Sequence, residues 1–276
     1  MRKITLLATG ALVTALALAG CGSSGGGTAG QNGNSGNSGG ASVEAGSSLS
    51  LLADQVRKTS SAKQSVHVVM NITEGEETVK GQGDMSFGGS PAIDLTLEVP
   101  EMAELAMRLV DGVFYLKLPD GLTQGKPWVK LDTKGTDPMS QTLGSLMEQV
   151  KDNGDPTKML EQLKDSGMIT AKKSEQLAGK DTTHYSVSID VAKSIEKQTD
   201  PKLKKLLEDS VAKSGVKQLP LEMWVDAEGL PVRITSDQPT GDAGKTGKLV
   251  VDYSDWGKPV TVTAPTAGQV GELPHS

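Results

Sequence analysis

Apolar and polar side chains alternate along much of the chain after residue 64, and this period of two predicts β-strands with one buried face. The alternation is clear at 65–72, in ETVKGQGDMSFG (77–88) and in AIDLTLEV (92–99). Two further runs flank Asp111-Gly112, a pair that predicts a two-residue hairpin turn. Together with the short run PWVKLD, they predict an antiparallel meander of about six strands.

The second half of the chain repeats this alternation. It occurs in MITAKKSEQLAG, in DTTHYSVSID, in GKLVVDYSDWG, and in LPLEMWVDAEGLPVRITSDQ, where Glu228-Gly229 predicts a hairpin. One strand of the first meander, ETVKGQGDMSFG, carries Gly81 and Gly83 at alternate positions. Paired glycines in a strand indicate bending or the close approach of another backbone.

Four segments follow a helical period instead. Residues 49–60 place Leu52 and Val56 on one face, and DPKLKKLLEDSVAKSG (200–215) carries an apolar stripe behind an Asp-Pro start. Two mid-chain segments, 139–151 and 156–165, also carry apolar faces. The order is a helix, strands, two helices, two strands, a helix and strands, which predicts an α+β fold with helices on one face of a large antiparallel sheet.

A sheet of about ten strands curls strongly under its own twist. Helices laid across the mouth of such a sheet enclose an apolar interior. We expect the helices and the sheet to face each other there, through side chains assigned from periodicity alone. These predicted cavity residues are Val68, Met70, Leu95, Leu97, Met107, Leu109, Leu143, Leu146, Met147, Leu160, Leu163 and Val187.

The filling of this interior leaves two alternatives open. Nine methionines follow Met1, against eight aromatic residues in the chain. Unbranched, polarizable Met fits irregular or adaptable apolar space. The methionines are therefore either ordinary core residues or the lining of a pliable cavity.

The N-terminus predicts export and lipid attachment. Arg2 and Lys3 precede an uncharged apolar run, so residues 1–20 are expected to be a signal peptide, with an apolar part too short to span a bilayer. The predicted cleavage site lies within Leu18-Ala19-Gly20-Cys21, a sequence that resembles the lipobox of bacterial lipoproteins. In that class the cysteine is acylated and becomes the new N-terminus. Cys21, the single cysteine of the chain, is therefore the predicted lipidation site and membrane anchor.

Residues 21–48 predict a tether between that anchor and a folded domain. Residues 22–48 contain ten Gly and seven Ser, with Val43 the one sizeable apolar side chain. Such a composition does not offset the entropy of ordering the backbone, so a disordered Gly/Ser segment is expected. A domain at 49–263 follows, and residues 264–276 are expected to be a flexible C-terminal tail.

The net negative charge argues against binding to nucleic acid and against electrostatic binding to anionic lipid. Removal of residues 1–20 takes away Arg2 and Lys3 and no acid, so 26 basic residues face 34 acidic ones and the formal charge moves from −6 to −8. No basic block is present, which argues against nucleic acid. Electrostatic attraction to anionic lipid is absent as well, so membrane attachment is expected to come from the acyl anchor.

No pattern in the sequence predicts catalysis, a metal site or a cofactor. His67, His184 and His275 are scattered, lack metal-ligand spacing and are each expected to be exposed. No serine lies in a G-x-S-x-G elbow. The three tryptophans stand near strand ends, where core or rim packing is more common than a sugar platform. We therefore expect a protein that is not an enzyme.

The chain resembles the actinobacterial LppX/LprAFG-type lipoproteins, whose fold is similar to that of the LolA/LolB lipoprotein carriers. The resemblance covers residues 49 to about 263 and rests on VFYLKLP…PWVKLD, the mid-chain helices, THYSVSID, MWVDAEGLPVRI and VVDYSDWGKPVTVTAP. It implies a half-barrel of about eleven strands wrapped on helices, with an apolar cavity that holds acyl chains. Members of that family are associated with carrying lipids or acylated glycolipids outward from the inner membrane.

Two hypotheses about function follow. In the first, a lipoprotein on the extracytoplasmic face of the cell membrane binds and carries a lipid or acylated glycolipid, and works with a membrane transporter. In the second, the domain is a solid, non-carrying scaffold or accessory partner of a membrane or cell-wall protein. The presence of bound lipid distinguishes them.

Overall fold

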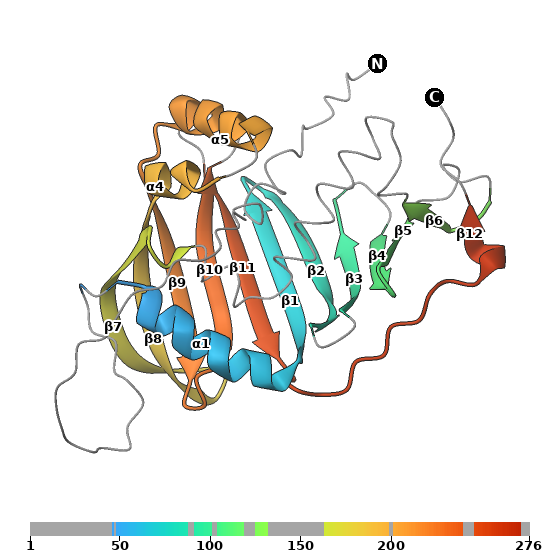
Figure 1. Ribbon diagram of the computed structural model, residues 1–276, viewed down its shortest axis with the longest axis horizontal. Helices are drawn as coiled ribbons and strands as arrows, with labels where there is room; N and C mark the ends of the chain where they lie inside the picture. Colours follow the sequence, from blue (N-terminus) through green and yellow to red (C-terminus); the bar gives the residue numbers. More distant parts are fainter. Residues whose placement is uncertain are drawn as a thin grey trace, which may run out of the picture.

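The computed structural model describes residues 46, 48–87, 91–100, 104–118, 125–131, 163–198, 201–239 and 246–271. These residues form one curved, unclosed sheet of 12 strands with few helices (Figure 1). The strands are β1 (Ser65–Glu74), β2 (Glu77–Ser86), β3 (Ala92–Glu98), β4 (Leu105–Val110), β5 (Val113–Lys117), β6 (Trp128–Leu131), β7 (Gly167–Leu177), β8 (Lys180–Asp190), β9 (Gln218–Asp226), β10 (Pro231–Pro239), β11 (Thr246–Ser254) and β12 (Val270–Gly271).

Two antiparallel meanders make up the sheet. β1 to β6 follow one another across one half, β7 to β11 across the other, and the pairing of β1 with β11 joins the halves. β12 adds a parallel pair to β6, which makes the sheet mixed. The predicted α+β class and curved, open sheet are confirmed, with 12 strands in place of the expected ten or eleven.

The predicted hairpin turn between β4 and β5 is confirmed by its backbone angles. Asp111 and Gly112 have φ of 52° and 74°, and two positive values in succession are what a type I′ turn requires. The turn continues the right-handed twist of its flanking strands, so the meander stays in register from β3 through β5.

Helix α1 (Ser50–Lys63) confirms the first predicted helix and crosses one face of the sheet in Figure 1. It buries Leu52, Ala53 and Val56 completely, and it ends at Gln64 in a left-handed conformation with φ 63°. Three side chains at this spacing share one helix face, so α1 closes an apolar core against the strands beneath it.

The remaining helices lie at the ends of strands. α5 (Pro201–Ser214) confirms the helix predicted at 200–215. The short α4 (Val191–Glu196) was not predicted; the Asp190 side chain accepts a hydrogen bond from the Lys193 backbone N–H and caps it. Both helices lie beyond one end of β8 to β10 in Figure 1. The helices predicted at 139–151 and 156–165 lie outside the described residues, except for the last residues from Leu163 onward.

The predicted flexible tail is wrong for residues 264–271. After β11 the chain runs along one end of the sheet to the short helix at Ala267–Gln269 and to β12 (Figure 1). Arg108 donates to the Thr263 carbonyl at 3.3 Å and Lys126 to the Val270 carbonyl at 3.0 Å. These bonds and the pairing with β6 order a segment whose composition alone predicts a coil; residues 272–276 lie outside the described part.

The core has two parts. The larger lies beneath α1 and combines Leu52 and Val56 with side chains of β1 and β7 to β11. The smaller is built by β3 to β6 around Phe114 and Leu109, each 1% exposed. Met85 and Leu95 pack against both parts, so the apolar interior is continuous across the sheet.

Candidate functional site

One face of the sheet carries the apolar side chains predicted for the interior. Residues directly opposite each other in an antiparallel pair project to the same face, so cross-strand register identifies that face. Val68 lies opposite Gly83, which lies opposite Leu95, which lies opposite Met107. All seven predicted sheet positions share this face, called here the apolar face: Val68, Met70, Leu95, Leu97, Met107, Leu109 and Val187.

Coverage of the apolar face is uneven. Val68 and Val187, which belong to the core part beneath α1, and Leu109, in the smaller part, are 3%, 2% and 1% exposed. Met70 and Leu97 are only half-buried, and so are Leu95 and Met107. The half-buried residues lie on β1, β3 and β4, so within the described part of the chain the apolar face extends beyond the area that α1 covers.

The two glycines of β2 let neighbouring groups approach closely at the centre of this face. A Cβ at Gly81 would lie 2.6 Å from Cγ of Met70 and 2.7 Å from Cδ2 of Leu97, so these two side chains lean over the glycine. At Gly83 the obstacle is backbone, because a Cβ would lie 2.1 Å from the carbonyl oxygen of Asp94. The predicted close approach of another backbone is therefore confirmed at Gly83.

The other predicted site residues divide into two groups. Leu163 is 8% exposed and belongs to the core part beneath α1. The remaining ones lie outside the described residues and their predicted roles stay predictions: Cys21, Leu143, Leu146, Met147 and Leu160.

The opposite face of the sheet is polar and carries cross-strand ion pairs. Arg233 binds Asp252 at 2.6 Å, and Arg108 binds Asp94 at 3.0 Å, each across neighbouring strands. The Arg108 guanidinium also lies 4.8 Å from the centre of the Trp128 ring. Half-exposed cross-strand pairs of this kind each contribute only about 0.2–1 kcal/mol. Their clearest consequence is chemical contrast: one face of the sheet offers apolar contacts and the other offers charges.

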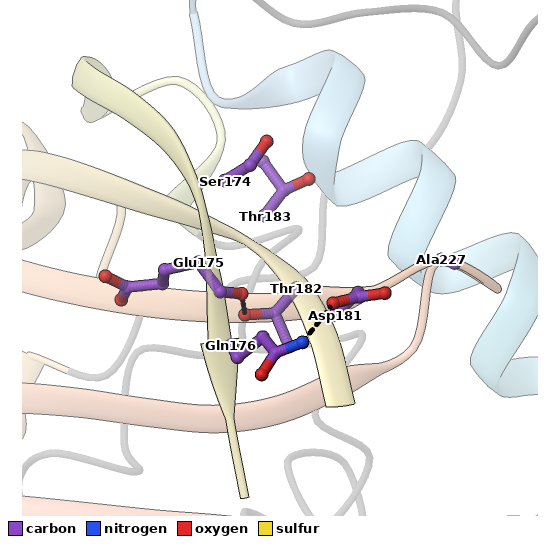
Figure 2. Close-up of a pocket in the computed structure, with 7 residues that line it drawn as sticks. All are labelled: Ser174, Glu175, Gln176, Asp181, Thr182, Thr183 and Ala227. Atoms are coloured by element: carbon purple, nitrogen blue, oxygen red, sulfur yellow. Dashed lines mark hydrogen bonds between the residues drawn. The ribbon is translucent and has the colours of Figure 1, made fainter. Parts of the chain in front are cut away.

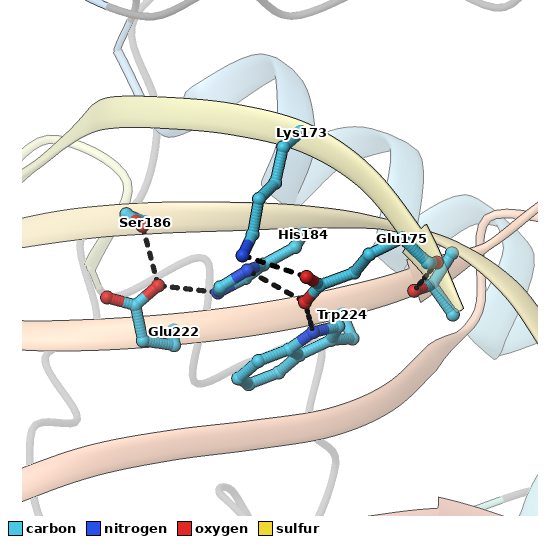
Figure 3. Close-up of polar contacts among 7 residues, drawn as sticks. Lys173, Glu175, His184, Ser186, Glu222 and Trp224 are labelled. Atoms are coloured by element: carbon cyan, nitrogen blue, oxygen red, sulfur yellow. Dashed lines mark hydrogen bonds and ion pairs between the residues drawn. The ribbon is translucent and has the colours of Figure 1, made fainter. Parts of the chain in front are cut away.

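The densest polar cluster lies where β7, β8 and β9 meet, and Figure 3 shows it. His184 stacks on Trp224 with ring centres 4.0 Å apart and planes 11° from parallel. Its Nε2 lies 2.6 Å from Glu222, which also accepts a hydrogen bond from the Ser186 hydroxyl at 2.6 Å. Its Nδ1 lies 3.0 Å from Glu175. This group of residues is called here the His184 cluster.

The two contacts of the His184 ring are of different kinds. The Nε2 contact with Glu222 has hydrogen-bond geometry, whereas Nδ1 is within ion-pair distance of Glu175 but is oriented away from hydrogen-bond geometry. Trp224 also donates its indole N–H to Glu175. The His184 side chain is consequently only 11% exposed, so the expectation of an exposed histidine is wrong here. Burial arises from Trp224, which approaches from a strand distant in sequence.

Glu175 is the acidic residue of the cluster whose pKa is lowered by its hydrogen-bond donors. Hydrogen bonds from Lys173 and then from Trp224 hold the pKa of its carboxyl group below the ordinary value. The Lys173 ammonium lies 2.8 Å from the carboxylate, and the Glu175 side chain is 31% exposed. The charge is therefore stabilised by specific donors rather than by burial.

We expect Glu175→Gln to remove a pH-dependent part of the stability. Because the folded pKa lies below the unfolded value of about 4.3, ionised Glu175 stabilises the fold above that value, and the contribution is lost as pH falls through the folded pKa. Urea unfolding should show a larger difference in free energy between wild type and Glu175→Gln at neutral pH than in acid. The glutamine keeps an oxygen for the Trp224 N–H, which isolates the charge.

A matched comparison comes from Lys173→Met, which removes the strongest cause of the lowered pKa. In that background the pH-dependent difference caused by Glu175→Gln should shrink. A difference that is equal at neutral and acid pH would contradict the prediction.

A shallow depression of about 370 Å³ opens at the β7–β8 hairpin beside this cluster (Figure 2). It is lined by Ser174, Glu175, Gln176, Asp181, Thr182, Thr183 and Ala227. Within it Gln176 donates to Asp181 at 3.0 Å and Thr182 donates to the Glu175 carbonyl at 2.8 Å. The depression is distinct from the half-buried apolar residues on β1, β3 and β4.

Two further observations concern the described residues alone. They contain no group of three or more His, Cys, Asp or Glu side chains placed to hold a metal ion. Among them no helix has the length and the apolar character that crossing a bilayer requires.

Sequence reasoning found the strands that carry the His184 cluster but not the cluster. Its residues lie on the polar faces of β7, β8 and β9, as the alternation predicts. The signal that could have identified it is the coincidence of Trp, Glu and His at matching polar positions of three predicted strands. The use of that signal requires the register between β8 and β9, which the alternation does not supply.

Comparison with known proteins gives distant likenesses. No family profile matches the chain. An uncharacterized 31.2 kDa protein from the rplA-rplJ intergenic region of Streptomyces griseus is 27% identical over 161 residues, which are 56% of this chain and 52% of that protein. The chain thus matches about half the length of this curated relative.

Solved structures give weaker likenesses still. The MucA/MucB complex of Pseudomonas aeruginosa aligns with 79% of this chain and 59% of that chain, at a TM-score of 0.34 and 13% identity. A DUF1329 family protein from Desulfovibrio piger aligns with 77% of this chain and 95% of that chain, at a TM-score of 0.31 and 10% identity. Likenesses at this level assign no family and no function.

Proposed function

We propose that the protein is a lipid-anchored lipoprotein on the extracytoplasmic face of the cell membrane, and that it binds and carries a lipid or acylated glycolipid. The acyl chains lie against the apolar face of the sheet. The observation that carries the proposal is the extension of that face beyond α1, where Met70 and Leu97 are half-buried around Gly81. The Cys21 lipobox supports the location of the protein.

The physical support is the fit between this surface and an acyl chain. Burial of apolar area is worth roughly 0.8 kcal/mol per methylene, so even part of an acyl chain gains several kcal/mol on an apolar surface. Met70 and Met107 add adaptable, polarizable contacts that suit chains of differing shape. The ion-paired face of the sheet offers no comparable surface, so binding is expected on one face only.

Lipid binding is tested first by identification of what the protein holds. The full chain carrying Cys21→Ala, which has no acyl group of its own, is purified and extracted with organic solvent, and the extract is analysed by mass spectrometry. The same protein is titrated with a fluorescent fatty-acyl probe. A carrier yields co-purified lipid and saturable uptake; neither is expected of the solid scaffold, and their joint absence would favour that alternative.

The binding face is tested by Leu97→Trp. Leu97 is half-buried and projects over Gly81, so an indole there is expected to occupy the surface that an acyl chain uses while the melting temperature stays close to wild type. Probe uptake should fall about tenfold, the equivalent of roughly 1.4 kcal/mol of lost contact. Probe titration and thermal unfolding on the same sample provide both measurements.

Two matched variants make this result specific. Thr96→Trp places the same aromatic group on the same strand but on the polar face, opposite Gln82, and should leave uptake unchanged. Leu109→Trp enters a site that is 1% exposed, so it should overpack the core and cost about 1–3 kcal/mol of stability. Full probe uptake by folded Leu97→Trp would remove the apolar face as the lipid site.

A further inference from the structure

β7 is the last strand of the sheet, and part of its outer edge is unpaired. The start of β7 is covered, because Ser48 bridges Met168 and the Gly46 N–H donates to the Ile169 carbonyl at 2.5 Å. A register shift between Ile169 and Ala171 follows. Beyond it, residues 171–177 pair with β8 and with no other strand of the described part of the chain.

An unpaired edge of seven residues offers backbone donors and acceptors to another strand. Ala171 to Ser174 are exposed, and so is Gln176, so side chains leave this edge accessible. In Figure 1 β7 lies at the outer margin of the sheet, with α1 crossing the face rather than the edge. Within the described part of the chain, no other strand occupies this edge.

The sequence of this edge is complementary to itself. In AKKSEQL (171–177), antiparallel pairing of two copies about Ser174 places Lys173 opposite Glu175 of the second copy. Lys172 then lies opposite Gln176, and Ala171 lies opposite Leu177. Ser174 is also the midpoint of the unpaired stretch 171–177. The register that brings opposite charges together therefore also pairs all seven residues of the stretch.

Parallel in-register pairing and the neighbouring residue-centred antiparallel registers meet like charges. Parallel in-register pairing places Lys172 and Lys173 against their own copies. Antiparallel pairing about Lys173 or about Glu175 brings two like charges directly opposite each other, which destabilises a strand pair. Adjacent lysines on an edge also discourage pairing with unrelated strands. The register about Ser174 thus brings opposite charges together and pairs the whole stretch, whereas the parallel in-register arrangement and the registers about Lys173 and Glu175 are penalised.

We propose that the protein associates with a second copy of itself by antiparallel pairing of the two β7 edges about Ser174. The contact is isologous, with a two-fold axis through the Ser174 pair. Lys173 already lies 2.8 Å from Glu175 of its own chain, so in the dimer two lysines and two glutamates form one alternating group of charges. The sheets of the two copies become continuous across the axis.

Cysteine cross-linking tests the register directly. The full chain carrying Cys21→Ala has no other cysteine, so each introduced thiol reports one position. In Ser174→Cys the two copies meet at the axis with Cα atoms about 4.5–5.5 Å apart, within the disulfide range. In Lys172→Cys the two thiols lie about 13 Å apart along the strands and do not bridge. Non-reducing electrophoresis after equilibration in a glutathione buffer measures the dimer fraction.

Most of the Ser174→Cys chains should be cross-linked, with little cross-linking of Lys172→Cys or of Gln176→Cys alone. An equal mixture of Lys172→Cys and Gln176→Cys should again give a disulfide dimer, because those two positions lie opposite each other. All three substituted side chains are exposed, so the variants are expected to fold like the parent, which circular dichroism checks.

Sedimentation velocity of the Cys21→Ala chain over a range of concentrations supplies an independent measurement. Lys173→Glu should weaken the dimer about tenfold, because it opposes two glutamates at two symmetric positions. The exchange Lys173→Glu with Glu175→Lys should restore it. A chain that stays monomeric at all concentrations, or equal cross-linking of Ser174→Cys and Lys172→Cys, would overturn the proposal.

Discussion

Gly83→Ala is expected to lower the free energy of unfolding by about 3 kcal/mol or more. The Cβ of an alanine there would lie 2.1 Å from the carbonyl oxygen of Asp94 and 2.8 Å from Cα of Leu95. Both atoms belong to the backbone of β3, which pairs with β2 along its whole length. Relief of the clash requires the two strands to separate, and this breaks ladder hydrogen bonds on both sides of the glycine.

Gly81→Ala is the matched control, two residues away on the same strand and face. Its Cβ would meet Cγ of Met70 at 2.6 Å and Cδ2 of Leu97 at 2.7 Å. Both contacts are with flexible side chains that are half-buried and can rotate away, so a loss of about 1 kcal/mol or less is expected. Urea unfolding of both variants beside wild type measures the difference. Equal losses at the two glycines would contradict the backbone explanation.

The strands could be predicted because one face of the sheet is apolar over most of its strands. Alternation identified β1 to β5 and β7 to β11, and a one-residue slip in any of them would have exposed the apolar set. The observed register places all seven predicted sheet residues on one face, from Val187 in β8 to Leu109 in β4. Local turn chemistry added Asp111-Gly112, whose positive φ angles follow from the residue types.

What could not be predicted depends on contacts between segments that are distant in sequence. β12 has only two residues and pairs with β6, so no local period marks it, and the order of residues 264–271 follows from that pairing. The burial of His184 likewise depends on Trp224, which follows forty residues later in the sequence. The pairing of β8 with β9 places the two rings against each other. Sequence periodicity predicts which face a side chain joins, whereas neighbours on other strands determine whether it is exposed.

The contrast between the two faces also limits where the proposed activities lie. α1 covers the apolar face over β7 to β11 and over the Val68 end of β1. The apolar side chains at Met70 of β1 and on β3 and β4 are half-buried. The unpaired edge of β7 lies at the opposite margin of the sheet from β6. The proposed lipid site near Leu97 and the proposed pairing edge of β7 therefore lie in separate parts of the molecule, so neither proposal excludes the other.

Cys21→Ala is expected to release the protein from the membrane fraction almost completely, or to leave it with its signal peptide uncleaved. A single acyl chain holds a protein only marginally, and two or three hold it stably, so loss of the cysteine proposed to carry them removes the proposed anchor as a whole. The formal charge of −8 after residue 20 supplies no compensating attraction to anionic lipid. The domain should stay folded, because the tether predicted at 21–48 separates the cysteine from the core beneath α1.

Fractionation of cells into membrane and soluble parts, followed by detection of the chain in each, measures this shift. Ser23→Ala is the matched control: it changes a residue two positions away, outside the lipobox, and should leave the protein in the membrane fraction. Mass spectrometry of the mature N-terminus should find acyl chains on wild type and Ser23→Ala and none on Cys21→Ala. A Cys21→Ala chain that still matures and sediments with membranes would show that another part of the protein holds it there, and the exposed Leu51 and Met168 would then be the first residues to replace.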